Sequence, residues 1–147
     1  MPLSADQTFA IANMFAIGGW LALAAGVALN NTRLRDTVAG WIWPTLLAFA
    51  YVTIIGGLMS GVIAGPESGD LSTLAGVMSF FASPWAATAG WIHYLAFDLF
   101  VGTRIAQEAA RDGVARVWLI PILPLTLMLG PAGLLLFNLV RPIARKR

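Results

Sequence analysis

Hydrophobic residues fall into four long runs along the chain, separated by short polar segments. Each run is long enough to cross a bilayer, because an α-helix rises ~1.5 Å per residue and about 20 residues span the ~30 Å hydrocarbon core. The pattern therefore predicts an all-α integral membrane protein, a four-helix transmembrane bundle made of a single domain. The predicted spans cover about residues 9–29, 40–64, 84–103 and 117–140 of the 147-residue chain.

A shorter apolar segment, residues 71–83, lies directly before the third predicted span. It is too short to cross the bilayer, and the Pro84 that follows it suits the first turn of a new helix. We therefore expect a short interfacial or re-entrant helix there. Prolines interrupt the fourth span at positions 121, 124 and 131, so this helix is predicted to be kinked or broken.

Charged residues make up 11% of the chain, against about 25% of a typical soluble domain. The nine Lys and Arg residues lie in the predicted loops and tail, where they indicate membrane topology rather than nucleic-acid binding. With four crossings, the four basic residues of the tail would lie on the opposite side of the membrane from five arginines of the loops. This nearly even distribution does not strongly favour either orientation of the chain. The arginines after the first span favour an external N-terminus, and a fifth crossing stays open.

The third predicted span contains the only histidine of the chain, His93, together with Asp98. An aspartate at the centre of a membrane helix costs roughly 2.5–3.5 kcal/mol on insertion scales, and such groups usually face a protein interior or a wet cavity. At about 100° per residue, Tyr94 and Asp98 share one face of the helix, while His93 and Phe97 lie on an adjacent face. The two ionisable groups can line two walls of one cleft, as a general acid and a general base.

Each of these two candidate catalytic residues also has a structural interpretation. His93 can bond backbone carbonyls across a helix interface through its two ring nitrogens. Asp98 can be a buried carboxyl that is tied to Tyr94 or to an arginine, or that carries a proton. The sequence leaves these alternatives open. With one histidine and no cysteine, no metal site and no redox cofactor are expected.

Six further side chains are candidates for substrate binding. The aromatic ones can line a flat apolar ligand, although such residues more often pack between helices or mark the membrane interface. The two asparagines can contact substrate or form interhelical hydrogen bonds. The arginine lies near the predicted membrane boundary and can instead extend its charge to water. These candidates are Asn13, Trp91, Tyr94, Phe97, Arg104 and Asn138.

Two stretches of the sequence resemble a known family of membrane proteins. They are GWIHYLAFDLFVG, residues 90–102, and GPAGLLLFNLVR, residues 130–141. Together they are similar to the family of the plant abscisic-acid-deficient-four proteins, which are proposed to be neoxanthin synthases. The similarity is close over roughly the last 60 residues and holds only in pattern over the first 80. Arg104 is a departure, since an aromatic residue is expected there in many relatives.

The resemblance implies a carotenoid isomerisation that needs no redox cofactor. In this reaction a proton leaves the polyene and a 5,6-epoxide opens to an alcohol, which requires a base at carbon and an acid at oxygen. By position, His93 is the expected base, because an imidazole suits proton abstraction near neutral pH. Asp98 is then the acid, provided that it carries a proton, and the two roles can also be exchanged. The expected substrate is a carotenoid or another lipophilic isoprenoid.

Two other functions stay open as alternatives. One is a non-enzymatic accessory protein that binds a carotenoid or a lipid. The other is a small transporter, which at this size would need to form a homo-oligomer. For all three functions we expect a multi-pass protein of a bacterial inner membrane, in contact with membrane lipid and without a nucleic-acid partner. The isomerase differs from the others in requiring His93 and Asp98 to point into one aromatic cavity.

Overall fold

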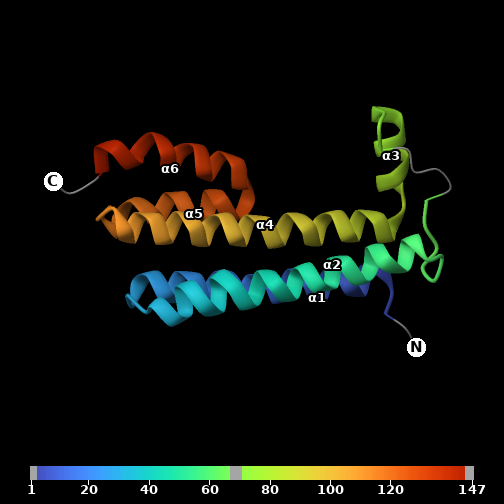
Figure 1. Cartoon of the computed structure of the whole chain (residues 1–147), viewed down its shortest axis with the longest axis horizontal. Coiled ribbons are helices and arrows are strands. Elements are labelled where there is room, and N and C mark those ends of the chain that lie inside the picture. The colour runs from blue at the N-terminus through green and yellow to red at the C-terminus, as the bar shows by residue number, and fades with distance from the viewer. Residues whose placement is uncertain (1–2, 67–70, 145–147) are drawn as a thin grey trace.

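The computed structural model describes residues 3–66 and 71–144. The regular elements in these residues are helices, which confirms the all-α prediction. Figure 1 shows the long helices lying along one another and the α5–α6 pair covering about half of the length of α4. The elements are α1 Ala5–Ala28, η1 Arg33–Ile42, α2 Trp43–Met59, α3 Leu74–Ala82, α4 Pro84–Arg111, η2 Arg116–Trp118, α5 Leu119–Met128 and α6 Gly130–Ala144.

Two helices in the described part of the chain are long and apolar enough to cross a membrane, Ala5–Ala28 and Arg33–Met59. The second is a continuous rod made of η1, which has π-helical hydrogen bonding, and α2. α1 begins before the predicted residue 9, because Ser4 and Gln7 form a capping box at its first turn. Helix length and composition alone therefore support two of the four predicted crossings.

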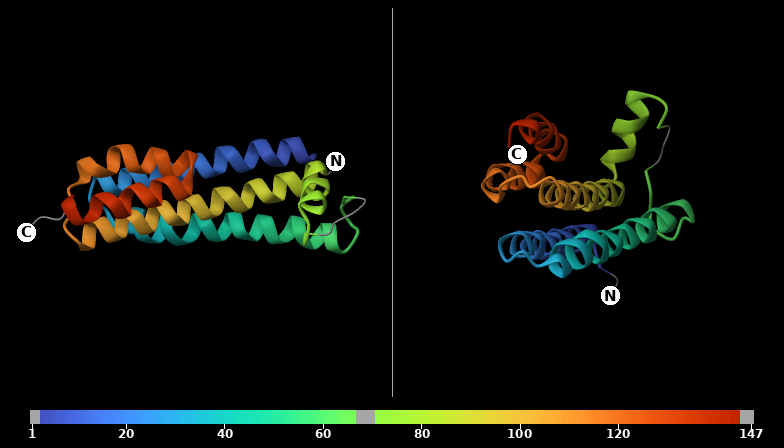
Figure 2. Two further views of the ribbon diagram at one scale, coloured as in Figure 1. Left: turned by 90° about the horizontal axis from the view of Figure 1, so that it is seen from above. Right: turned by 60° about the vertical axis from the view of Figure 1, so that its left-hand side comes forward.

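α4 packs against each of the other α-helices of the described chain and forms the centre of the molecule (Figures 1 and 2). It continues past the predicted third span to Arg111, and its charged final turns pair Arg104 with Glu108 at 3.7 Å. Glycine lets α1 approach α4 closely, since a Cβ added to Gly102 would lie 2.5 Å from the Trp20 ring. Close helix packing at a small residue is thus visible at this contact.

The predicted fourth span does not form one helix. α5 ends at Met128, and α6 begins at Gly130 and returns alongside α5. Both ends of this α5–α6 hairpin therefore lie at the same end of the molecule (Figure 1). The expected break in the helix is confirmed, whereas residues 117–140 do not run in one direction as a single span.

Close backbone contact explains why the chain reverses at this point. The carbonyl of Leu129 accepts hydrogen bonds from Ala132 N–H at 2.9 Å and from Gly133 N–H at 3.1 Å. A Cβ on Gly133 would lie 2.7 Å from backbone atoms of Thr126, so only glycine lets α6 fold this tightly against α5. The turn depends on contacts between the two arms of the hairpin.

The short helix predicted within residues 71–83 is present as α3, which stands away from the axis of α4 (Figures 1 and 2). Thr73 caps its N-terminus by accepting a hydrogen bond from Gly76 N–H at 3.1 Å. Phe81 lies directly over Gly90 of α4, where a Cβ would collide with the phenyl ring. This contact holds the end of α3 against the first turns of α4.

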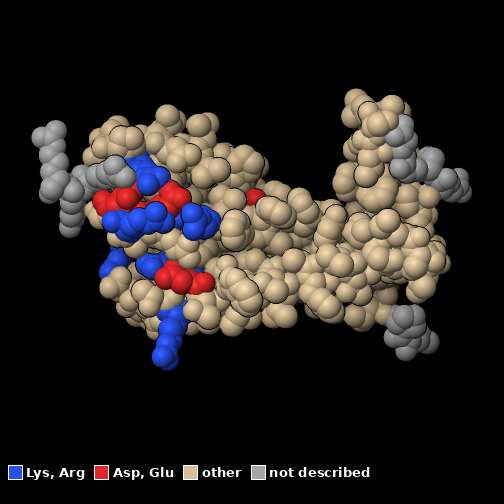
Figure 3. Space-filling view, in the orientation of Figure 1, with Lys and Arg blue, Asp and Glu red and all other residues tan. Residues whose placement is uncertain are grey.

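Charged side chains gather at one end of the molecule, while the rest of the visible face has almost none (Figure 3). At this charged end, Arg141 of α6 reaches back to α4 and pairs with Glu108 and Asp112, each at 2.5 Å. The end of α6 therefore lies beside the loop arginines, whereas four crossings would place it opposite them. The described arginines of the charged end are Arg33, Arg35, Arg104, Arg111, Arg116 and Arg141.

Candidate functional site

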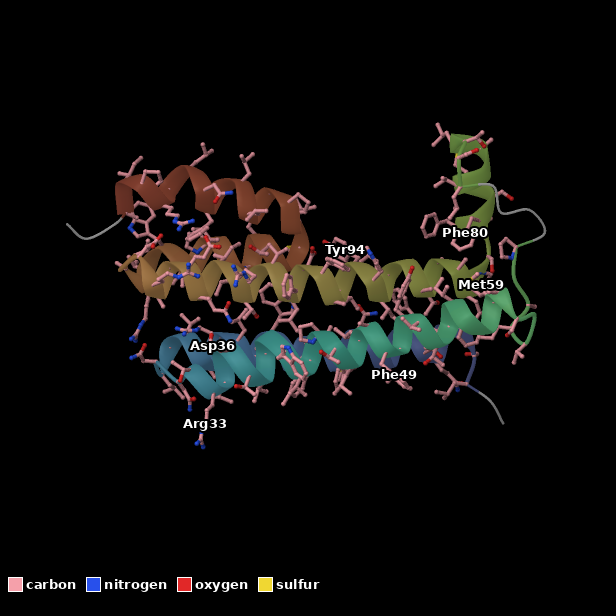
Figure 4. The ribbon with its side chains drawn as sticks, in the orientation of Figure 1. Arg33, Asp36, Phe49, Met59, Phe80 and Tyr94 are labelled. Carbon is pink, nitrogen blue, oxygen red and sulfur yellow. The ribbon has the colours of Figure 1, made fainter. Side chains whose placement is uncertain are left out.

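A cavity of about 680 Å³ lies between α2, α3 and the first half of α4. We call it the α2–α3–α4 cavity. Most of its lining is aliphatic or aromatic, and Figure 4 shows Phe80 on α3 and Met59 on α2 near each other at this end of the molecule. It is far from the charged end. The lining residues are Tyr51, Ile55, Leu58, Met59, Leu71, Val77, Phe80, Phe81, Gly90 and His93.

His93 places an imidazole on the wall of this cavity. Its ring centroid lies 5.5 Å from that of Tyr51 on α2 and 4.6 Å from that of Phe97, one turn further along α4. The contact with Phe97 confirms that the two residues share a face of the helix. His93 is exposed and makes no hydrogen bond to any residue that the structure describes. Its surroundings thus differ from those of a structural histidine bonded to backbone carbonyls.

Asp98 is buried on a different face of α4, against the tip of the α5–α6 hairpin. The Tyr94 hydroxyl and the Gly130 N–H lie beside its carboxyl group, whose Oδ2 has no hydrogen-bond partner among the described residues. Tyr94 also donates a hydrogen bond to the Met128 carbonyl. A Cβ on Gly130 would overlap with the carboxyl group of Asp98. The carboxyl group of Asp98 is therefore packed against the residues that join α5 to α6.

The structure does not bring His93 and Asp98 together. His93 lines the α2–α3–α4 cavity, and Asp98 is not among the residues that line it. The physical reason is the angle between them, since five residues of α-helix turn a side chain by about 140°. Different elements cover the two faces: α2 and α3 lie beside His93, while the hairpin tip covers Asp98. Of the alternatives for Asp98, the buried carboxyl beside Tyr94 matches its position.

Three of the predicted substrate-binding residues form a chain of contacts that leads to Asp98. Asn13 of α1 accepts a hydrogen bond from Trp91 Nε1 at 3.0 Å, and the Trp91 ring stacks on Tyr94 with centroids 5.2 Å apart. Asn13 thus makes the interhelical bond that was the alternative to substrate contact. The chain Asn13–Trp91–Tyr94–Asp98 links α1 to the hairpin across α4.

Arg104 and Asn138 lie away from the cavity. Arg104 follows His93 by eleven residues, or about 16 Å along the helix, and its partner is Glu108. Asn138 is exposed on α6. Among the described residues, no group of three or more His, Asp or Glu side chains lies close enough together to hold a metal ion.

Three aromatic lining residues were not selected from the sequence: Tyr51, Phe80 and Phe81. Tyr51 carried a usable signal, since it is one of only two tyrosines and lies in the middle of the second apolar run. The two phenylalanines belong to the short segment before Pro84, for which the sequence predicted a helix but no ligand contact. Their role depends on how α3 folds over α4.

The fold is that of a helical protein with two long apolar helices and a lipophilic cavity beside a third. The model of the ABA DEFICIENT 4-like family matches residues 7–137, and the chain belongs to this family. This confirms the resemblance seen in residues 90–102 and 130–141. The family suggests a role in carotenoid-related metabolism, and together with the two apolar helices it is consistent with a membrane protein. No curated protein and no solved structure matches the chain.

Proposed function

We propose that the protein is a membrane-embedded isomerase that converts a carotenoid or a related lipophilic isoprenoid in the α2–α3–α4 cavity. One observation carries this proposal: an exposed imidazole, His93, lies on the wall of an apolar and aromatic cavity of about 680 Å³. Small-molecule sites in proteins typically measure roughly 300–1,000 Å³ and combine an apolar lining with a few polar groups. The cavity has both properties.

In the proposed membrane arrangement, α1, the η1–α2 rod and α4 cross the bilayer, and the α5–α6 hairpin enters and leaves on one side. The support is the charge distribution, because this arrangement places the six described arginines of the charged end together. Basic loops favour the cytoplasmic side, so the charged end is cytoplasmic. The α2–α3–α4 cavity then lies toward the opposite leaflet, where a lipophilic substrate can enter from the lipid.

The proposed chemistry transfers one proton from carbon to oxygen. His93 accepts a proton from the ring-side carbon of the polyene, the electron pair forms a new carbon–carbon π bond, and the epoxide carbon–oxygen bond breaks. The Tyr51 hydroxyl, whose ring lies 5.5 Å from the imidazole, donates its proton to the epoxide oxygen. The proton on His93 then returns to the Tyr51 oxygen. The net change is an isomerisation, and no oxidant or reductant is consumed.

Asp98 has a structural role in this proposal instead of the role of catalytic acid. It faces the hairpin tip, and Tyr94 of α4 and the Gly130 N–H lie beside its carboxyl group. Its contribution is to hold the hairpin against the middle of α4.

A second candidate function is carotenoid binding without conversion. The observation that favours it is the separation of His93 from Asp98, which leaves the imidazole without a carboxyl group beside it among the described residues that line the cavity. Binding of an apolar pigment requires only the apolar walls. Under this alternative, substitution of His93 leaves pigment retention unchanged and there is no product to lose.

Expression in a host that makes epoxy-carotenoids, followed by chromatography of the extracted pigments, tests the proposal. Wild type is compared with His93→Gln and Tyr51→Phe, and with Phe100→Leu, an exposed α4 position outside the cavity lining, as the control. A new isomer that disappears in the first two variants and persists in Phe100→Leu supports the isomerase. Unchanged pigments that co-purify with the protein favour binding alone, and unchanged pigments without co-purification refute both functions.

A further inference from the structure

Two cavities meet at the charged end of the molecule. The first, of about 520 Å³, lies between the end of α1, the start of η1 and the last turns of α4, and we call it the head cavity. The second, of about 450 Å³, lies between α1 and α5, and we call it the α1–α5 groove. Both are lined by Val27, Arg116 and Leu119, so they adjoin each other.

The head cavity carries two arginines, and one of them, Arg116, has no acidic partner among the described residues. Arg35 is engaged by Asp36, with two bonds of 2.7 and 2.8 Å. Arg116 is exposed, donates from Nη1 to the Ala28 carbonyl at 3.2 Å, and has no acidic partner among the described residues. A guanidinium group has five N–H donors, so Arg116 can still bind an anion.

The surrounding charge also favours an anion. The described residues of the charged end include six arginines but three acidic residues, Asp36, Glu108 and Asp112. The three acids already pair with Arg35, Arg104 or Arg141. A net positive charge therefore remains beside the head cavity.

The α1–α5 groove is apolar and opens on the outer surface of the hairpin. Its lining includes Val117 and Ile120, whose side chains are 62% and 70% exposed, together with Leu123 and Pro124. Ala24 on α1 contributes only a methyl group, which leaves room between the two helices. In a bilayer these surfaces face acyl chains.

We propose that an anionic phospholipid occupies the two cavities together, with its phosphate on Arg116 and one acyl chain in the α1–α5 groove. An arginine suits a phosphate because its planar N–H groups match two phosphate oxygens at once. The cationic pocket and the apolar groove share three lining residues, so one molecule can occupy both. Such a molecule needs a charged group joined to an apolar chain, which makes it an amphiphile. This lipid site lies at the opposite end of the molecule from the His93 cavity and does not depend on the isomerase proposal.

Thermal unfolding in a neutral detergent, with native mass spectrometry of bound lipid, tests this site. The additions are phosphatidylglycerol, phosphatidylcholine and inorganic phosphate. We expect one retained phosphatidylglycerol and a raised unfolding midpoint, and neither effect with the other two additions. Stabilisation by inorganic phosphate alone would show that the site binds a free anion and not a lipid. Stabilisation by phosphatidylcholine equal to that by phosphatidylglycerol would show that the negative charge of the lipid does not matter. Either result overturns the proposal.

Two variants and one matched control locate the site. Arg116→Gln keeps an amide donor for the Ala28 carbonyl but loses the charge, so phosphatidylglycerol affinity should fall roughly tenfold to hundredfold. Ala24→Phe fills the groove at an exposed position and should also weaken binding. Arg33→Gln removes the same charge from a side chain that points away from the helices (Figure 4) and should bind as wild type does. Equal affinity in Arg33→Gln and Arg116→Gln, or full binding by Ala24→Phe, refutes the proposed position.

Discussion

The α5–α6 hairpin makes a definite prediction about which residues face the same side of the membrane. A water-soluble reagent should reach the end of α6 from the same side of the membrane as the end of α4. It should reach the N-terminus from the other side. The chain has no cysteine, so single-cysteine variants give labelling without background. Suitable exposed positions are Leu3 before α1, Ala110 at the end of α4, and Ile143 at the end of α6.

The lengths of the two arms exclude a crossing by either one. α5 has ten residues, which at ~1.5 Å each extend about 15 Å, or half of the ~30 Å hydrocarbon core. α6 has fifteen residues and extends about 22 Å, which is also too short. Because α6 folds back beside α5, the two lengths do not add. The chain therefore returns to the side from which it entered.

The assay is labelling of Leu3→Cys, Ala110→Cys and Ile143→Cys with a membrane-impermeant maleimide, in intact cells and after permeabilisation. We expect Leu3→Cys to be labelled in intact cells. Ala110→Cys and Ile143→Cys should react only after permeabilisation, because the charged end is expected to be cytoplasmic. If Ile143→Cys reacts together with Leu3→Cys and apart from Ala110→Cys, residues 117–140 cross the membrane and the hairpin is refuted.

Two further predictions concern the contacts that hold the hairpin and α1 against α4. Gly130→Ala should destabilise the protein by about 1–3 kcal/mol in reversible unfolding, because the new methyl group overlaps with Asp98. The control is Gly56→Ala, which should not destabilise the protein in this way because no atom lies within 4 Å of the added Cβ. An equal loss of stability in both variants would contradict the close contact at Gly130. Asn13→Ala and Trp91→Phe should each cost about 0.6 kcal/mol, and the double variant should cost less than their sum, since both remove one interhelical hydrogen bond. Strict additivity would show that this bond does not form.

Helical periodicity was sufficient to predict which residues of α4 lie together. The spacing of His93 and Phe97 predicts the observed ring contact, and the spacing of Tyr94 and Asp98 predicts that they share a face. The extension of the helix to Arg111 is consistent with the spacing of Arg104 and Glu108, which lie one turn apart on α4. These features depend on local geometry, which the sequence determines directly.

Hydropathy could not reveal the hairpin. Residues 117–140 are apolar throughout and long enough for one crossing, and two half-length helices have the same composition. Prolines and glycines indicated a break but not the direction of the chain after it. That direction depends on the contact of Gly133 with Thr126 and on the backbone at Leu129, which only the folded structure shows.

The candidate site could be predicted only in part, because it also depends on packing between helices. His93 was recognised because an ionisable group in an apolar run is rare, and the same reasoning selected Asp98. Whether two faces of one helix meet in one cleft depends on the helices that cover them. The position of Tyr51 beside His93 likewise depends on how α2 packs against α4.

The proposed function depends on His93, which acts as a general base on an isoprenoid bound in the α2–α3–α4 cavity. The most direct measurement is conversion of an epoxy-carotenoid by the purified protein in lipid nanodiscs, with wild type and His93→Gln compared for both product and bound pigment. We expect His93→Gln to retain the pigment and to lose conversion by about 10²-fold or more, which is the usual contribution of a general base. Conversion by His93→Gln at the wild-type rate would contradict the assignment, and bound pigment without conversion by the wild type would show a binding protein instead of an isomerase.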